Sequence, residues 1–204
     1  MQAVYDFFRV LDAAAARSAD AAAAAYRGAL SGRTEERETA LRLLAGYETA
    51  CRNAEPAFLE HLRKQFLTPV DRMDLWVLFR CTSVLTEAAG AVLRTLCICR
   101  AFPVRHEATA LLEAMQTACA SARDAAQCFG RRRREAEFWR FREKSMAALA
   151  AGERYGAQYL QALCAFGDRE AARNYPVYGA LRCDLEACGQ FLDRLTEAVL
   201  RNAS

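Results

Sequence analysis

Apolar residues along this chain recur three and four positions apart over long stretches, a spacing that places them on one face of an α-helix. Six such stretches follow one another, at about 3–30, 34–66, 68–99, 104–129, 131–166 and from residue 176 onward. Four of them hold nearly thirty residues and are therefore roughly 40–45 Å long. Because short connections make long neighbouring helices antiparallel, the pattern predicts an all-α, elongated antiparallel six-helix bundle.

The inward-facing positions of four of these helices can be read from the same spacing. For the second and third helices they are Leu41, Leu44, Glu48, Cys51, Glu55, Phe58, Leu62 and Phe66, then Leu75, Leu78, Thr82, Leu85, Ala89, Val92, Leu96 and Cys99. For the fourth and sixth helices they are Leu111, Leu112, Met115, Cys119, Ala122 and Ala126, then Tyr178, Leu181, Leu185, Cys188, Leu192, Leu195 and Val199.

Local signals mark where the helices begin and end. Thr34 is expected to cap the second helix, and Thr68-Pro69-Val70-Asp71 is a strong start signal for the third. There the Thr68 hydroxyl can cap, Pro69 fits the first helical position and Asp71 can reach back to the Thr68 amide. Gly130 is expected to end the fourth helix, and a polar connector over 169–174 is expected before the last one.

The composition agrees with long helices and limits the classes of partner that the protein is expected to bind. Ala is abundant, whereas Gly (10) and Pro (4) are scarce, and Ala is the best helix former. The net charge of +3 is too small to indicate a nucleic-acid or membrane partner by itself. The nine cysteines lack C-x-x-C spacing, so we interpret them as small buried residues in a reducing compartment.

Neither a signal peptide nor a membrane span is expected. The first residues have no basic region followed by an apolar core, and no stretch approaches the roughly 18 consecutive apolar residues of a spanning helix. We therefore expect a cytoplasmic protein that reaches a membrane only through a partner.

A weak internal repeat suggests two related halves. Glu48 precedes Thr68-Pro69-Val70 by about twenty residues, and Glu153 precedes Tyr175-Pro176-Val177 by a similar interval. The pattern predicts a single domain, 1–204, made of two three-helix units at about 1–101 and 104–204.

The segment Phe66-Leu67-Thr68-Pro69-Val70-Asp71-Arg72-Met73-Asp74-Leu75 resembles the Phe-x-Thr-Pro-x-Asp-Arg-x-Asp signature of the Pit-accessory branch of the PhoU-like family. Asp6-Phe7-Phe8, Leu111-Leu112 and the stretch from Leu185 to Leu200 also fall where that family's helices fall. The resemblance implies a PhoU-like double three-helix fold. It also implies an accessory or regulatory role in inorganic phosphate transport, exerted on a Pit-type permease, and it implies no catalysis.

PhoU-like proteins also resemble one another in Glu-x-x-x-Asp pairs, which place two carboxylates one helical turn apart to share a cation. Here each such pair keeps at most one carboxylate: Glu48 is followed by Arg52, Glu153 by Ala157 and Glu186 by Gln190, while the third helix offers Glu87. A multinuclear centre needs several converging anionic ligands. We therefore assign no metal ligands and no cofactor.

Glu48 and Glu55 lie in the apolar stripe of the second helix, where an unpaired carboxylate is costly. Arg52 is four residues after Glu48 and three before Glu55, within side-chain reach of both. One hypothesis is an Arg52-centred ion pair in place of metal. The alternative is that the helix is exposed near Pro56 and all three are surface charges.

The basic run Arg131 to Arg134 and the two histidines complete the candidates. The run, with Arg140 and Arg142 and the interleaved aromatic residues Phe138, Trp139 and Phe141, fits either an anion-binding surface or a solvated helix start over a core cluster. His61 and His106 lack a Glu three residues earlier, so we interpret both as surface residues.

Three classes of function follow from these observations. The first is an accessory protein of phosphate transport that binds a Pit-type permease. The second is a helical adaptor that has lost that role, and the third is a nucleic-acid binder using the Arg131 cluster. No P-loop, G-x-S-x-G or H-E-x-x-H motif occurs, so no catalytic residue is assigned and an enzyme is not expected. The sequence permits a homodimer without requiring one.

Overall fold

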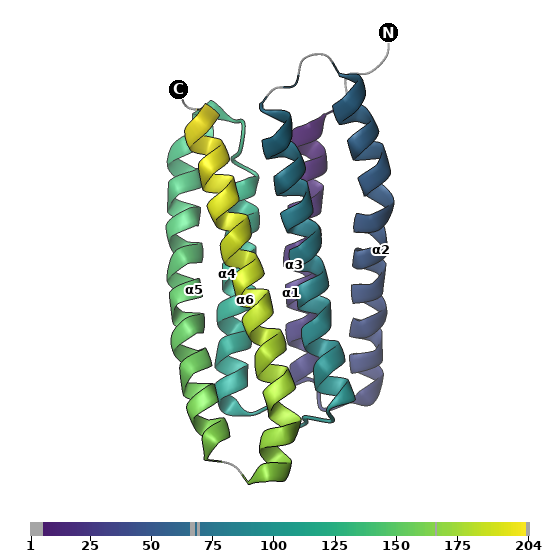
Figure 1. Cartoon of the computed structure of the whole chain (residues 1–204), viewed down its shortest axis with the longest axis vertical. Helices are drawn as coiled ribbons and strands as arrows, with labels where there is room; N and C mark the ends of the chain where they lie inside the picture. Colours follow the sequence, from purple (N-terminus) through teal and green to yellow (C-terminus); the bar gives the residue numbers. More distant parts are fainter. Residues whose placement is uncertain (1–5, 66–67, 69, 166, 203–204) are drawn as a thin grey trace.

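A computed structural model describes residues 6–65, 68, 70–165 and 167–202 of the chain. This part folds into six α-helices and one short 3₁₀ helix. Their bounds are α1 (Phe7–Leu30), α2 (Thr34–Lys64), α3 (Arg72–Ile98), α4 (His106–Ala126), η1 (Arg132–Arg134), α5 (Glu135–Cys164) and α6 (Asp168–Asn202). The six α-helices lie side by side as long rods that alternate in direction, and α1 begins at the same end of the bundle at which α6 ends (Figure 1). The predicted all-α six-helix bundle is thus confirmed.

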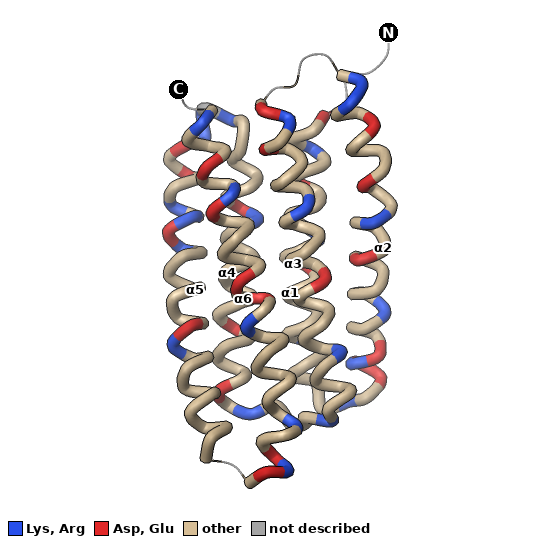
Figure 2. Tube along the Cα trace, in the orientation of Figure 1, with Lys and Arg blue, Asp and Glu red and all other residues tan. Residues whose placement is uncertain are grey.

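The helices pack as two groups of three. Helices α1, α2 and α3 contact one another, as do α4, α5 and α6, and the two groups meet where α1 packs on α4 and where α3 packs on α6. Charged residues of both signs are spread along the rods and toward both of their ends (Figure 2). The sequence similarity of the two halves, about 1–101 and 104–204, stays a prediction.

The middle of the bundle depends on α1, whose buried face consists mostly of alanine. This helix contacts α2, α3 and α4. Its buried small residues are Ala14, Ala15, Ser18, Ala19, Ala21, Ala22, Ala24, Ala25, Gly28 and Ala29. At Gly28 a Cβ atom would lie 2.6 Å from Leu93 Cδ2 and 2.8 Å from Ala40 Cβ. Helices α2 and α3 therefore approach α1 too closely for a side chain at that position.

Near the end of the bundle that carries the chain termini, aromatic rings replace the alanines. Phe58 on α2 stacks on Phe79 of α3 with ring centroids 4.5 Å apart and meets Phe7 of α1 edge to face at 5.5 Å. All three rings are buried. Such pairs add about 0.5–1.5 kcal/mol beyond the area that they bury, so this cluster fixes how the first three helices meet.

The start of α3 differs from the prediction. Asp71 is the N-cap: its Oδ1 accepts hydrogen bonds from the amides of Met73 (2.7 Å) and Asp74 (3.4 Å). The Thr68 hydroxyl instead donates to the Val70 carbonyl at 2.7 Å. The expectation that Thr68 caps α3 is therefore wrong, because α3 begins later, at Arg72. Pro69, expected at the first helical position, lies outside the described residues.

Two further boundaries differ from the prediction, and one agrees with it. Thr34 is the first residue of α2 and not its cap; Arg33 holds that position without a side-chain cap. The expected connector over 169–174 is helical, since α6 begins at Asp168 and runs through Pro176. The carbonyl that Pro176 leaves without an amide donor belongs to Ala172, which is exposed to water, and this lowers the cost of a proline inside the helix. The basic run forms the 3₁₀ turn η1 after Gly130, whose φ of +71° fits the predicted stop.

Helix α3 is long and apolar enough to cross a membrane by length and composition alone. In the bundle it packs against α1, α2 and α6, and half of its apolar window is buried among them. We therefore interpret its apolar character as that of a core helix.

Replacing Asp71 by Ala should lower the free energy of unfolding by about 1 kcal/mol, because two amides at the start of α3 lose their acceptor. The variant Asp71→Ser keeps an oxygen that can cap and should retain most of the stability. Urea denaturation of the three proteins measures the difference. A loss as large in Asp71→Ser as in Asp71→Ala would contradict the capping role.

Candidate functional site

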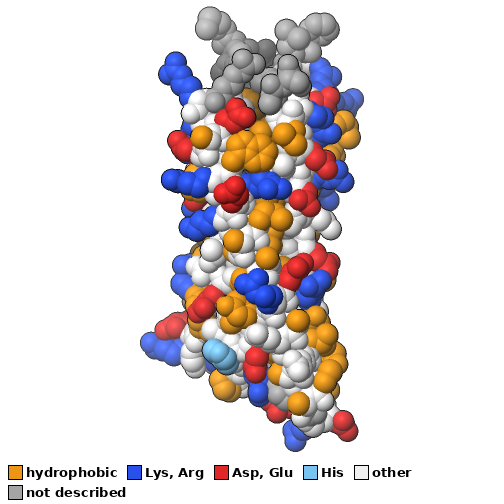
Figure 3. Space-filling model, turned by 90° about the vertical axis from the view of Figure 1, so that its left-hand side faces the viewer, with side chains coloured by type: hydrophobic (Ala, Val, Ile, Leu, Met, Phe, Trp, Pro, Cys, Tyr) orange, Lys and Arg blue, Asp and Glu red, His pale blue; other side chains and the backbone are white. Residues whose placement is uncertain are grey.

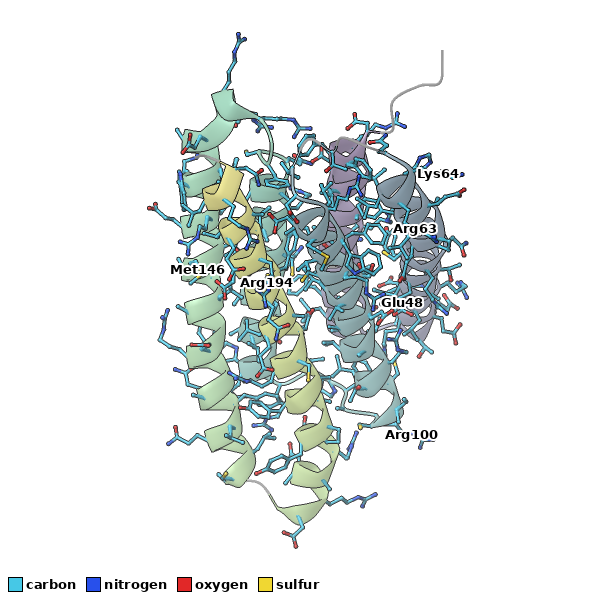
Figure 4. The ribbon with its side chains drawn as sticks, turned by 45° about the horizontal axis from the view of Figure 1, so that its top comes forward. Glu48, Arg63, Lys64, Arg100, Met146 and Arg194 are labelled. Carbon is cyan, nitrogen blue, oxygen red and sulfur yellow. The ribbon has the colours of Figure 1, made fainter. Side chains whose placement is uncertain are left out.

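The two acidic residues in the stripe of α2 form ion pairs with arginines of α3. Glu48 Oε1 accepts a hydrogen bond from Arg94 Nη1 at 2.6 Å, and Glu55 Oε2 accepts one from Arg80 Nη1 at 3.0 Å. The Glu48 side chain is only 13 % exposed. In Figure 4 Glu48 is labelled between α2 and α3. These α2–α3 pairs are the candidate site.

Helix geometry brings these four residues together. Glu48 and Glu55 are seven positions apart on α2, and Arg80 and Arg94 are fourteen apart on α3, so each set lies along one helix face. Because α2 and α3 run antiparallel, the later glutamate meets the earlier arginine. The sequence already showed two glutamates on one face of α2 and two arginines on one face of α3. It identifies them as partners only once the two helices are known to be neighbours.

Gly90 makes room for the inner pair. A Cβ atom at this buried position would lie 2.3 Å from Glu48 Oε1 and 2.8 Å from Arg94 Nη1. The guanidinium of Arg94 also donates to the Glu87 carbonyl at 3.3 Å, which holds it against its own helix. The Glu48–Arg94 contact is therefore built into the packing of α2 on α3.

The Arg52-centred ion pair is contradicted. Arg52 is exposed on α2, and the carboxylates of Glu48 and Glu55 are paired across to α3 instead. The physical reason is the direction of the stripe: both glutamates face α3, whereas Arg52 lies on the outer side of the same turns. The alternative, that all three are ordinary surface charges, holds for Arg52 alone.

Chemically, the paired carboxylates cannot act as a cation cage. Each faces a guanidinium, so the charge that would attract a dication is already balanced. Between the two pairs, the Cys51 thiol lies 3.8 Å from the Thr86 hydroxyl, which donates to the Thr82 carbonyl at 2.8 Å. Within residues 6–65, 68, 70–165 and 167–202, no group of three His, Cys, Asp or Glu side chains is placed to hold a metal ion.

The structure does not bring the other acidic candidates together. Glu87 and Glu153 are exposed on α3 and α5. Glu186 is exposed on α6 and forms a 3.1 Å ion pair with Arg182 of the same helix. The assignment of no metal ligands itself stays a prediction.

The basic run and the histidines lie away from this site. Arg131 pairs with Asp12 of α1 at 2.5 Å, which ties the α4–η1 connection to α1. Arg134 pairs with Glu137 at 2.7 Å, a local contact at the start of α5. Phe138 is buried, as expected of a core aromatic residue. His106 is exposed at the start of α4, and His61 is half-buried in the last turn of α2.

Sequence reasoning missed Asp184, a buried carboxyl group on α6. Asp184 is 2 % exposed, and its Oδ1 has no hydrogen-bond partner within the described part of the chain. Burial raises the pKa of Asp184 to about 8. A hydrogen bond with Cys188, together with burial, raises the pKa of the nearby Cys119 thiol. The sequence did hold a signal: Asp184 comes three residues after Leu181 and four before Cys188, a spacing that places it on the same apolar face of the helix.

Comparison with solved structures identifies the architecture. The chain superposes on the crystal structure of a PhoU-like protein from Shewanella oneidensis MR-1 with a TM-score of 0.76 at 15 % identity, covering 96 % of this chain and 100 % of that one. A second chain from the same organism, proposed to be a PhoU-like phosphate regulatory protein, gives a TM-score of 0.72 at 15 % identity with the same coverage. The fold is PhoU-like. No family model matches the sequence, and no curated protein matches it either.

The PhoU-like fold accounts for the six-helix order over nearly the whole chain, since both relatives are covered from end to end. At this low identity the comparison establishes the fold alone. Within this PhoU-like bundle, the chain carries the α2–α3 ion pairs and the buried Asp184.

Replacing Arg94 by Ala should lower the free energy of unfolding by about 1–3 kcal/mol, because the mostly buried Glu48 loses its partner. The matched change Arg52→Ala removes the same charge from α2 and should cost less than about 0.5 kcal/mol. Adding Glu48→Gln to Arg94→Ala should recover most of the loss. Equal losses in the two single variants, measured by urea denaturation, would refute the assignment of partners.

Asp184 should make the stability depend on pH. Its pKa is raised in the folded state, so the folded state binds the extra proton and stability falls as the pH rises from about 4 to about 8. The expected loss between pH 5 and pH 9 is about 4 kcal/mol at most. Asp184→Asn cannot ionise and should be more stable than the wild type at pH 9. Parallel stability–pH curves for the two proteins would show that Asp184 ionises normally.

Proposed function

We propose that this chain is a cytoplasmic PhoU-like accessory protein that regulates inorganic phosphate transport by binding a Pit-type permease. The observation that carries the proposal is the end-to-end match of its six helices to two PhoU-like chains, one of them proposed to be a phosphate regulatory protein. The segment 66–75, with its Thr-Pro-x-Asp-Arg pattern, supports the Pit-accessory branch. Asp71 of that segment caps α3, and Asp74 pairs with Arg201 of α6, so part of the signature serves the fold.

In this proposal the protein acts by binding and not by catalysis. The glutamates of α2 that resemble the family's acidic motifs pair with arginines of α3, as Glu48–Arg94 and Glu55–Arg80, which supports a regulation that needs no metal cluster. The two arginines do structurally what a bound dication would do, which is to balance carboxylates between two helices.

The charge distribution supports a protein partner over a nucleic acid. Arg131 and Arg134 are paired with Asp12 and Glu137, so the charge of two arginines of the basic run is already balanced within the protein. The face seen in Figure 3 alternates small hydrophobic groups with charges of both signs and has no continuous basic stripe. An adaptor that has lost the phosphate role remains the alternative, and it predicts the same fold with no permease partner.

The tagged chain, expressed in its own cell type, should co-purify with a Pit-type permease under mild detergent. Mass spectrometry of the eluate measures the enrichment against an eluate from cells that carry the tag alone. A transporter of unrelated type, extracted in the same detergent, serves as the negative control. If known membrane complexes are recovered, which shows that the extraction worked, but no Pit-type permease is enriched, the result contradicts the proposal and favours the adaptor.

Metal content tests the second part of the proposal. Protein that has met neither chelator nor nickel resin should contain well below one equivalent of iron, zinc or manganese by elemental mass spectrometry. Arg80→Glu with Arg94→Glu, which restores acidic character to α3, is the comparison. Stoichiometric metal in the wild-type protein would contradict the substitution of arginine for metal.

A further inference from the structure

The end of the bundle opposite the chain termini contains a hollow of about 620 Å³ between the α3–α4 connection and the first turns of α6. This is the lower end in Figure 1, where α4 and α6 both begin. Its lining is divided in two: Ala101, Phe102, Pro103 and Val104 are apolar, whereas Arg105, Arg169 and Arg173 are cationic. It lies on the second three-helix group and shares no residue with the α2–α3 pairs.

The arginines of the hollow outnumber its carboxylates. Glu170 is the acidic residue of the lining, and its Oε1 accepts from Arg105 Nη1 at 2.8 Å. Arg173 uses its Nε to donate to the Cys99 carbonyl at 3.3 Å, which leaves its two terminal nitrogens for other acceptors. Arg169 forms no ion pair with any other residue that the structure describes. Three arginines against Glu170 give the lining a net charge of about +2, and Glu107, whose Oε2 lies 3.6 Å from Arg105 Nε beside the hollow, reduces it to about +1.

The walls of the hollow are held in place by buried polar contacts. Asn174 is buried; its Oδ1 accepts from the Tyr159 hydroxyl at 2.9 Å and its Nδ2 donates to the Glu170 carbonyl at 2.9 Å. On the other side, the guanidinium of Arg37 lies 4.1 Å from the centre of the Phe102 ring. The first turn of α6 is therefore fixed to α5, and the connecting loop is fixed to α2, so the hollow exists before any ligand arrives.

We propose that this hollow binds a phosphate-type oxyanion between Arg105, Arg169 and Arg173. Guanidinium groups match tetrahedral oxyanions in charge and in donor geometry, and several of them converging on one hollow is the arrangement that such an anion requires. The positive end of α4 adds to the attraction, because this helix begins at His106 without a side-chain cap. The apolar wall beside the cations can contact the organic part of a phosphate monoester. With free inorganic phosphate, that wall would stay in contact with water.

Binding is measured on the full chain by isothermal titration calorimetry with inorganic phosphate and with phenyl phosphate, at constant ionic strength in acetate. The combined variant Arg169→Ala with Arg173→Ala should weaken binding about tenfold or more. The matched control is Arg100→Ala, which removes a cation from the same end of the bundle but not from the hollow (Figure 4). It should change the dissociation constant by less than about twofold.

The two ligands distinguish the source of the phosphoryl group, and either preference supports the proposal. Tighter binding of phenyl phosphate indicates a monoester, and equal or weaker binding indicates the free anion. Absence of heat with both ligands up to about 10 mM overturns it, as does equal weakening by Arg100→Ala. Arg169→Glu tests the same site without disturbing the Arg173–Cys99 contact, and unchanged melting in phosphate-free buffer confirms that the variants fold. The outcome does not depend on any permease, so it succeeds or fails separately from the regulatory role.

Discussion

The whole arrangement depends on how closely helices can approach α1. Its buried face consists mostly of alanine with one essential glycine, and three other helices pack directly on it. Small side chains bring backbones together, so the central region gains its stability from many short contacts and little from large side chains. Because α2 and α3 both pack on α1, their positions along each other are fixed. The aromatic cluster and the α2–α3 ion pairs form at the residues that this alignment places opposite one another.

The ion pairs between α2 and α3 show what that close packing demands of polar residues. A carboxylate carried into a helix–helix contact must meet a partner there, and the nearest suitable groups belong to the facing helix. Glu48 and Arg94 meet only because residue 90 is a glycine. Pairs of this kind contribute little net stability when intact, but they fix which helix faces which.

The sequence predicted the fold well because long, strongly periodic helices leave few alternatives. Nearly every residue predicted to face inward on α3 and α4 is buried, but the predicted stripes cover only part of each buried face. Phe79 and Leu93 of α3 and Ala118 of α4 were missed, because a helix that packs against three others buries more than one stripe. Errors fell at the boundaries, where Thr68 and Asp71 compete for the same capping role and a proline at 176 is tolerated beside water-exposed backbone.

The site was predicted only in part, because Arg52 was the sole partner within reach along one helix, whereas Arg80 and Arg94 become neighbours through the tertiary fold. Asp184 was missed for a similar reason. It lies beside the apolar stripe of α6, and whether such a residue is buried depends on which helices pack there, which the sequence of α6 does not specify.

The alternation of helix direction has one practical consequence. The start of α1 and the end of α6 lie at one extremity of the rods, whereas the basic hollow lies at the other, where α4 and α6 begin (Figure 1). At 1.5 Å per residue, the thirty residues of α5 separate the two extremities by about 45 Å. A protein attached to a surface by either terminus therefore presents the hollow outward, free for a soluble ligand to enter. Fusion tags at the termini stand too far away to block it.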